Sequence, residues 1–260
     1  MTKYCITLII SLLLSFYGLA IDVDWGSTGH RVTGKIAAKY LSKKAKRKVR
    51  KLLKDESLAF VSTYADEIKS DKKYRAFYVW HFVNMPLNGN YEDSEKNPKG
   101  DLLSGIEYCI EVLKNKNSLD KDKRFYLKML VHLIGDLHQP LHLGRKEDKG
   151  GNSIEVQWHG KKTNLHSVWD EAILSKWNMS YTELANSFPC LSKQQIKNIN
   201  KGNISDWVEE SHKLTTKIYQ SIEQSKNLSY WYSYIYFPLV RKQLQKGGLR
   251  LAKLLNSIFC

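Results

Sequence analysis

The sequence predicts a mostly α-helical protein with a single domain and one small β-hairpin. The strongest helical segment is residues 125–137, in which apolar side chains recur every three or four positions, and residues 102–113 repeat this pattern. Two long segments, residues 204–222 and 230–258, favour further helices near the C-terminal end. The 260 residues are 42% hydrophobic, which suffices for one sizeable core and excludes a disordered chain.

The first residues differ in composition from the rest of the chain. Lys3 supplies a short basic start, residues 6–19 run almost without charge, and small residues lead to Ala20. This pattern is typical of a cleaved secretory signal peptide over residues 1–20, with cleavage that could extend to residue 24. A membrane anchor is the alternative, but the apolar run is short for a span of about 20 residues. We expect a secreted or periplasmic protein without stable membrane insertion.

The folded domain is expected to occupy residues 25–260, with helices that begin at polar residues. Ser27 and Thr28 are predicted to cap the first helix, and Ser42 a second, very basic one. Pro140 is expected to end the strongest helix, because proline lacks the backbone N–H that a helix interior needs.

The hairpin is predicted from strict alternation. Ile154, Val156 and Trp158 alternate with polar residues, and His159 and Gly160 follow as a turn. The chain would then return as the second strand.

The charge of the chain indicates its kind of partner, and the cysteine content limits the number of disulfides. Lys and Arg total 41 against 26 Asp and Glu, a net charge of +15, which favours polyanionic partners. After Cys5 leaves with the signal peptide, Cys109, Cys190 and Cys260 remain at wide spacing. They allow one disulfide, and the absence of a C-x-x-C pair argues against a thiolate zinc site.

Histidine and aspartate recur at a fixed spacing. His132 and Asp136 lie four residues apart on the strongest helix, so both side chains share one face, and His142 follows. His166 and Asp170 repeat the spacing. Three further candidates precede them: His30, Asp66 and His81.

A single pair of this kind is more often an ion pair on a helix surface, but two pairs with a third histidine favour metal binding. Imidazole and carboxylate without cysteine are the ligands of catalytic zinc.

Six motifs carry a family resemblance in the family's order. They are WGSTGHR (25–31), YADEI (64–68), HFVN (81–84), HLIGDLHQPLH (132–142), GGN (150–152) and NLHSVWD (164–170). The chain resembles the zinc-dependent single-strand nucleases typified by mung bean nuclease and the fungal type I enzymes, over nearly all of residues 25–260. The resemblance implies the mostly helical phospholipase C/nuclease fold and cleavage of single-stranded DNA and RNA.

The resemblance also implies three Zn²⁺ ions. The ligand sets are Asp66, His81, His132 and Asp136 for the first ion; His142, His166 and Asp170 for the second; and His30, the bridging Asp136 and the backbone of Trp25 for the third. In the family, that tryptophan is the mature N-terminus. Cleavage after Ala20 would leave four residues ahead of Trp25, so either processing continues to Trp25 or the third ion is held differently.

The implied mechanism is hydrolysis by a zinc-activated water that attacks phosphorus in line, near Asp136, and leaves 5′ phosphates. A 3′-nucleotidase activity would use the same metals. Phe82 matches a family position that stacks on an unpaired base, with a core role as the alternative. Asn84 stands where studied family members carry Asp, and it can orient a water but cannot accept its proton.

Two other functions remain open from the sequence. A zinc phospholipase C shares the fold and a similar ligand set, but it ends its ligand run with Glu where this chain has Asp170. A protein that binds zinc or nucleic acid without turnover is the second alternative. We expect single strands and nucleotides as substrates, and a monomer.

The remaining histidines and aromatic residues have structural interpretations. His138 is predicted to hold the geometry of the metal site, and His212 to lie on a helix surface. Four aromatic residues near the C-terminal end are predicted to pack against helices: Trp231, Tyr232, Tyr234 and Tyr236.

Overall fold

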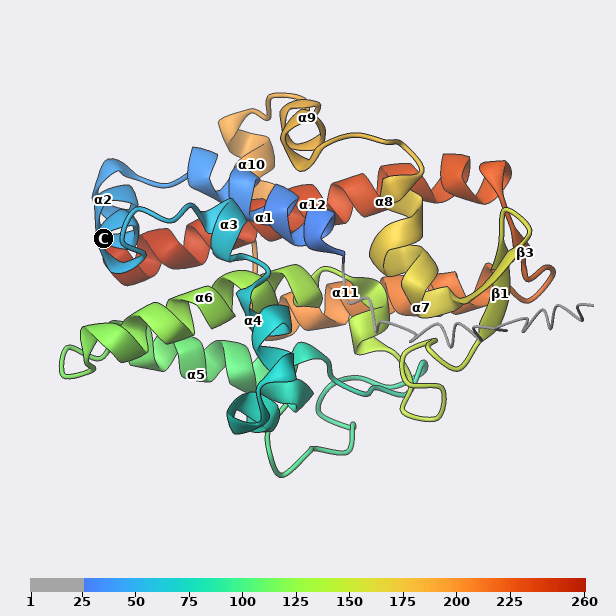
Figure 1. The fold of residues 1–260 in the computed structure, drawn as a ribbon, viewed down its shortest axis with the longest axis horizontal. Coiled ribbons are helices and arrows are strands. Elements are labelled where there is room, and N and C mark those ends of the chain that lie inside the picture. The colour runs from blue at the N-terminus through green and yellow to red at the C-terminus, as the bar shows by residue number, and fades with distance from the viewer. Residues whose placement is uncertain (1–25) are drawn as a thin grey trace, which may run out of the picture.

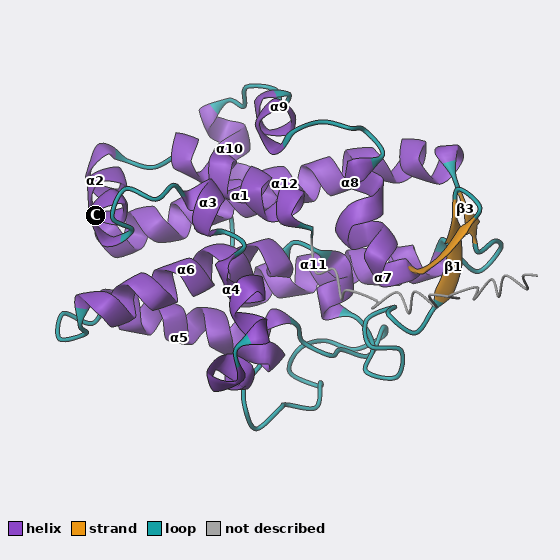
Figure 2. Cartoon of the chain, viewed as in Figure 1, coloured by secondary structure: helices purple, strands orange, loops and turns teal. Residues whose placement is uncertain are grey.

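The computed structural model describes residues 26–260 and is mostly helical, as the sequence predicts (Figures 1 and 2). The predicted signal peptide and Trp25 lie outside the described residues. Within the described part of the chain, no helix combines the length and apolar character needed to span a membrane.

The α-helices, in chain order, are α1 (Ser27–Lys39), α2 (Lys43–Leu52), α3 (Leu58–Val61), α4 (Tyr64–Glu67), α5 (Leu102–Lys114), α6 (Asp120–Leu137), α7 (Leu165–Ser167), α8 (Ile173–Ser175), α9 (Tyr181–Asn186), α10 (Lys193–Ile199), α11 (Ile204–Gln220) and α12 (Tyr230–Phe259). Three 3₁₀ segments are η1 (Ile68–Ser70), η2 (Lys72–His81) and η3 (Pro140–Leu143), and a π-helical turn, η4 (Val168–Ala172), connects α7 to α8.

Helix α12 forms the long axis of the molecule (Figure 1). Its 30 residues extend about 45 Å at the α-helical rise. Helices α1, α2 and α6 pack against it. The closest approach to α1 is at Gly248, where a Cβ atom would lie 2.5 Å from the Cβ of Ile36. Only glycine allows the two helix backbones to come this near, so this contact fixes α1, which carries His30, against the long axis.

Helix α6 is enclosed at its C-terminal half. Leu130, Leu133 and Ile134 are fully buried in the larger apolar cluster, which also includes side chains of α2, α5 and α12. A second apolar cluster includes Trp169 of η4 and Val32 of α1. Every residue of α6 from Met129 to Leu137 is buried. Polar side chains on these turns therefore face the protein interior.

The predicted hairpin is present. Strands β1 (Glu155–Trp158) and β2 (Lys161–Asn164) pair antiparallel, with Glu155 opposite Asn164. His159 and Gly160 form the turn, and both have positive φ angles. A third strand, β3 (Asn227–Leu228), pairs parallel to β1 and gives the order β2-β1-β3. The sequence did not indicate β3, because two residues are too short to show alternation.

The helix starts were only partly predicted. The Ser42 side chain accepts a hydrogen bond from the N–H of Ala45 at 3.1 Å, so the predicted cap of α2 is confirmed. The predicted capping by Ser27 and Thr28 is wrong, because both lie inside α1 and Gly26 occupies the N-cap without a side-chain bond. The strongest helix is longer than predicted, since α6 begins at Asp120.

Two predictions about the burial of side chains are also wrong. His212 is buried on α11, and its ring nitrogens Nδ1 and Nε2 lie 2.8 and 2.9 Å from the carbonyl oxygens of Leu143 and Pro86. Trp231 and Tyr234 are 72% and 66% exposed, because the first turns of α12 extend beyond the helices that would cover them.

Of the four aromatic residues predicted to pack against helices, Tyr232 lies as expected. Tyr232 is buried, and its hydroxyl accepts a hydrogen bond from the indole N–H of Trp169 at 2.9 Å. Within the described residues, all three cysteines are free thiols: Cys109, Cys190 and Cys260.

Candidate metal centre

Eight of the residues predicted as metal ligands lie together in the interior. They come from seven elements of the chain: His30, Asp66, His81, His132, Asp136, His142, His166 and Asp170. Trp25, the ninth predicted ligand, lies outside the described residues, but its neighbour Gly26 donates its N–H to the carbonyl oxygen of Asp170 at 2.8 Å. The chain thus enters α1 beside the last of the predicted ligands.

Helix α6 supplies the centre of the site. The i, i+4 spacing places His132 Nε2 3.1 Å from Asp136 Oδ2, and neither side chain is exposed. The Asp136 carboxylate also lies 3.4 Å from His30 Nε2 and 3.4 Å from His142 Nδ1. With His81 Nδ1 at 3.0 Å, this one carboxylate faces histidines from three other elements, which is the position that a bridging ligand requires.

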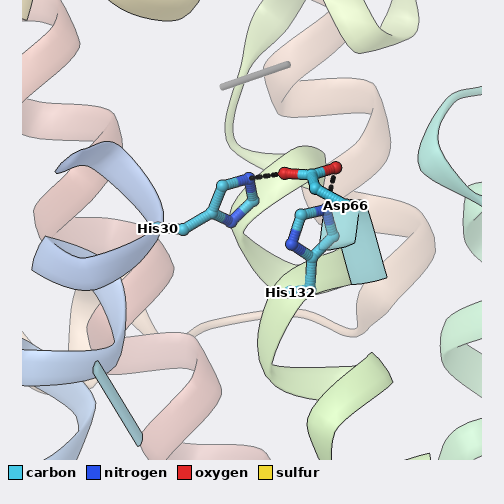
Figure 3. Close-up of side chains that lie close together, drawn as sticks. All are labelled: His30, Asp66 and His132. Atoms are coloured by element: carbon cyan, nitrogen blue, oxygen red, sulfur yellow. Dashed lines mark ion pairs between the residues drawn. The ribbon is translucent and has the colours of Figure 1, made fainter. Parts of the chain in front are cut away.

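The first of three clusters joins α1, α4 and α6. Figure 3 shows His30, Asp66 and His132 directed toward one another. The two imidazole rings stack with centroids 3.9 Å apart, and the Asp66 carboxylate lies 4.0 Å from His30 Nε2 and 3.3 Å from His132 Nε2.

The second cluster consists of His81, His132 and Asp136. His81 Nδ1 lies 3.0 Å from both His132 Nε2 and Asp136 Oδ2. Three potential donor atoms thus converge within the spacing that one metal ion spans.

The third cluster lies at the far side of Asp136. His166 Nε2 is 3.0 Å from Asp170 Oδ2, and His142 Nε2 is 3.6 Å from Asp170 Oδ1. The amide of Gln139 donates a hydrogen bond to Asp170 Oδ1 and fixes the carboxylate. The H-x-x-x-D spacing here crosses α7 and the π-helical turn, in contrast to the regular helix of the first pair.

Backbone carbonyls orient three of the histidines. The Nδ1 of His132 lies 2.7 Å from the carbonyl oxygen of Ser62, that of His142 2.8 Å from His81 O, and that of His166 2.7 Å from Gly150 O. A carbonyl only accepts, so each Nδ1 carries a proton, and each Nε2 is the ring nitrogen left for a metal ion. This is the usual arrangement of histidines that bind a metal.

The glycine motif explains one of these carbonyls. Gly150 has φ +62°, and a Cβ atom there would lie 2.4 Å from the carbonyl oxygen of Leu141. The left-handed conformation and the close approach both require glycine. Gly150 can therefore present its own carbonyl to His166.

Unpaired buried atoms test whether these residues fit a metal. Several nitrogen and oxygen atoms of the three clusters are buried without a hydrogen-bond partner, and such atoms are costly unless something satisfies them. They include both ring nitrogens of His30, both carboxylate oxygens of Asp136, and single atoms of Asp66, His81, His142 and Asp170. A set of imidazole and carboxylate donors without thiolate suits zinc and similar divalent ions, so the residues fit.

The titration behaviour follows from burial and charge. Burial alone would raise the pKa of Asp136, but His132 and His142 outweigh it and hold the pKa well below its usual range. Burial would lower the pKa of His132, yet Asp136 and Asp66 raise it to about 10. Burial, reinforced by Lys69, lowers the pKa of His81 to about 3. The buried carboxylate of Asp136 is thus ionised and attracts cations.

A cavity of about 620 Å³ opens onto the second and third clusters. His81, His142 and His166 lie at its wall, and Phe82 and Asn84, the predicted substrate and water contacts, line it as well. Phe82 is half-buried against the cavity, not part of the apolar core.

The same cavity has lining residues that the sequence analysis did not single out. Tyr78 meets Phe82 edge to face at 5.9 Å, and Lys146 and Lys149 add positive charge. Their only sequence signal is closeness to the HFVN and GGN motifs.

His138 is not one of the clustered residues. Its Nδ1–H donates to the carbonyl oxygen of Ile134 at 2.8 Å, and its Nε2 accepts from Arg250 at 3.1 Å. Burial and the nearby Arg250 lower the pKa of His138 to about 3, so it is neutral. It links the end of α6 to α12 and supports the helix that carries His132.

Comparison with known proteins agrees with this geometry. The S1/P1 nuclease family model matches residues 25–260. This chain belongs to the S1/P1 nuclease family. An S1/P1 nuclease is a hydrolase, and the predicted resemblance, fold class and enzyme class are thereby confirmed.

Three relatives illustrate the range of similarity within the S1/P1 nucleases. Endonuclease 4 of Arabidopsis thaliana is 32% identical over 90% of this chain and 89% of its own length. Nuclease S1 of Aspergillus oryzae is 30% identical over 68% of this chain and 64% of its own length. Nuclease P1 of Penicillium citrinum is 26% identical over 90% of this chain and 97% of its own length.

Proposed function

We propose that this S1/P1 nuclease hydrolyses single-stranded DNA and RNA to 5′-phosphorylated products, with three zinc ions held by the His/Asp clusters. The observation that carries the proposal is the meeting of metal-binding clusters and an aromatic side chain in one cavity. A phosphodiester placed over the clusters leaves its neighbouring base beside Phe82. A 3′-nucleotidase activity would place one phosphate at the same position.

Different side chains would hold the metal ions, orient the water and attract the substrate. Zinc ions bound here would supply Lewis acidity for the phosphate oxygens and for deprotonation of the attacking water. Asp136 would hold two ions at a fixed separation, because its two oxygens face different histidines. Asn84 would orient the water through its amide, and Lys149 would attract the phosphate backbone.

Preference for single strands follows from the shape of the cavity wall. Phe82 offers a ring face to a base, and a base in a duplex is already stacked and paired on both sides. Stacking is tolerant of base identity, so we expect cleavage with little sequence preference.

The test is hydrolysis by the purified mature protein of single-stranded DNA, RNA, duplex DNA and a choline phospholipid, each with and without a zinc chelator. We expect release of 5′-mononucleotides from single strands only, lost with the chelator and restored by zinc. Metal analysis should find three zinc ions per chain. Cleavage of the phospholipid alone would replace this proposal with a phospholipase, and bound zinc without any turnover would indicate a binding protein.

Maturation forms part of the proposal. We propose secretion with removal of the signal peptide, and processing to Trp25 would provide an α-amino group next to Gly26, which is bonded to the ligand Asp170. The intact mass of the secreted chain tests this directly. A mature chain that starts at residue 21 would contradict ligation of a metal by the α-amine of Trp25.

A further inference from the structure

Helix α2 carries the densest positive charge of the sequence. Residues 43–54 contain no acidic side chain. Their basic side chains are all exposed: Lys43, Lys44, Lys46, Arg47, Lys48, Arg50, Lys51 and Lys54. We call these eight residues the α2 basic face. The metal centre does not use it, since α2 lies at the end of the molecule next to the C-terminus, away from the sheet (Figure 1).

The structure leaves most of this charge uncompensated. Ala45 and Val49 are the buried residues of α2, and they seat the helix against α6 and α12. Arg50 pairs with Asp55, and Lys44 donates to the carbonyl oxygen of Cys260 at 2.7 Å. Within residues 26–260, the other six members of the α2 basic face make no ion pair. The face is therefore available to an anionic partner.

The charge pattern opposes the stability of the helix itself. Like charges three and four residues apart repel, as Lys43 and Arg47 do, or Lys44 and Lys48. The first turn holds Lys43 and Lys44 and no acidic residue, although a helix N-terminus favours negative charge. A pattern that breaks local rules without a compensating contact points to function.

Aromatic and basic side chains continue from α2 along the surface. Arg124 of α6 donates to the carbonyl oxygen of Leu52, the last residue of α2. One turn further on α6, Lys128 lies 4.9 Å from the ring centre of Tyr64 and pairs with Glu56 at 2.7 Å. The surface next to α2 thus already combines an ammonium with an aromatic ring.

Segments η1 and η2 extend this combination to the cavity. Lys73 lies 4.6 Å from the ring centre of Tyr74, and Lys69 lies 5.7 Å from that of Tyr78. Both ammonium groups also pair with a carboxylate, Lys73 with Asp71 at 3.1 Å and Lys69 with Asp66 at 3.0 Å. Tyr78 lines the cavity beside Phe82. Alternating positive charge and aromatic rings is how proteins follow a single strand: the cations meet phosphates and the rings stack on bases.

We propose that the α2 basic face binds the phosphate backbone of single-stranded nucleic acid, and that the tyrosine–lysine pairs guide the strand to the metal centre. This inference rests on the proposed nuclease function and specifies its substrate as long strands. Along α6, the contact at Arg124 is eight residues from His132, roughly 12 Å at the helical rise. A strand of several nucleotides spans that distance, whereas a dinucleotide occupies the cavity alone.

An anionic membrane would also attract positive charge, but the structure favours nucleic acid. A helix that lies in a membrane surface inserts its apolar face into the lipid. The apolar residues of α2, Ala45 and Val49, are already buried in the protein core. Only the charged face remains for a partner, and a flexible polyanion needs nothing more.

The test neutralises half of the α2 basic face in the full-length mature enzyme. The test variant carries Lys46→Gln, Arg47→Gln, Lys48→Gln and Lys51→Gln. The matched control removes four exposed charges from α10 and α11: Lys193→Gln, Lys197→Gln, Lys213→Gln and Lys217→Gln. Both variants lose the same net charge, so a difference in their kinetic constants shows that the position of the lost charges matters.

The measurement is KM and kcat for a dinucleotide and for a single strand of about 20 nucleotides, at several salt concentrations. We expect the test variant to raise KM for the long strand at least tenfold, with kcat and all dinucleotide constants unchanged. Its slope of log KM against log salt should fall by about 3, since each lost phosphate contact contributes about 0.7. The control should match the parent.

Three results would overturn the inference: equal effects of both variants, equal effects on both substrates, or an unchanged KM for the long strand. Loss of binding to phosphatidylserine vesicles with an unchanged KM would assign the α2 basic face to membranes instead. If the parent enzyme cuts neither substrate, the proposed nuclease function fails. Fluorescence anisotropy with the same long strand then still decides whether α2 binds it.

Discussion

Gly135→Ala is a one-methyl test of the metal centre. Gly135 lies on α6 between His132 and Asp136, and a Cβ atom there would lie 2.5 Å from Nδ1 of His30. Ordinary contact begins near 3.4 Å, so the ring must move by about 0.9 Å. The His30 ring has no free space to move into, because it is buried and stacks on the His132 ring with centroids 3.9 Å apart. Metal sites tolerate about 0.2 Å, so the ion held by His30 should be lost.

The direction of the effect of Gly135→Ala on the free energy of unfolding can also be worked out. Alanine in place of glycine favours a helix interior by about 1 kcal/mol, whereas overpacking costs about 1–3 kcal/mol. The free energy of unfolding of the chelated protein should therefore fall by up to about 2 kcal/mol. In a His30→Ala background the obstacle is gone, and the same change should stabilise the protein by up to about 1 kcal/mol.

The assays are zinc per chain after dialysis and urea unfolding of the metal-free proteins. A Gly135→Ala protein that keeps its full metal content and unfolds no earlier than the parent would refute this reasoning. Equal effects of Gly135→Ala in both backgrounds would show that the methyl group acts through a neighbour other than His30.

Three further predictions concern the cavity and α12. Phe82→Ala should raise KM for single strands about 5- to 150-fold with little change in kcat, since stacking on one base contributes about 1–3 kcal/mol; an unchanged KM would remove Phe82 from substrate binding. Asn84→Asp should increase kcat at pH values where the new carboxylate is ionised, and identical pH–rate profiles would exclude this role. The pKa of Glu210 is lowered because Lys246 and Arg250 outweigh its partial burial, so its stabilising effect is present above the ordinary pKa and is lost as pH falls. Glu210→Gln should thus cost up to about 1 kcal/mol in urea unfolding at pH 7, because solvent screens the partly exposed carboxylate, and less at pH 3; an equal loss at both pH values would contradict the ion-pair explanation.

The long helices could be predicted because each presents one apolar face. Residues 125–137 place Leu130, Leu133 and Ile134 at helical spacing, and all three are core residues. The short segments α3, α4, α9 and α10 have four to seven residues, too few for periodicity to separate them from loops.

Burial of single side chains was harder to predict. His212 shares the buried face of α11 with Ser211 and Thr215. Because these three side chains are polar, the sequence pattern does not show that this face points inward. Trp231 and Tyr234 show the reverse, because hydrophobicity cannot reveal that the first turns of a helix extend past their neighbours.

The metal-binding side chains of the candidate site could be predicted from the sequence. The backbone groups that orient them could not. The H-x-x-x-D spacing brought His132 and Asp136 together by helix geometry alone. The carbonyl groups of Ser62 and Gly150, which orient two of the histidines, have no sequence signature, because every residue has a carbonyl. Only the requirement for glycine at Gly150 gave an indirect sign of such a contact.

The carbonyl anchors tie metal uptake to the completion of folding. His132 is held by a carbonyl 70 residues away in the sequence, and His142 by one 61 residues away. A disordered chain cannot hold these rings in place, so the clusters offer a preformed set of metal ligands only after the chain has folded. A copy of the chain with the wrong topology therefore lacks these metal sites.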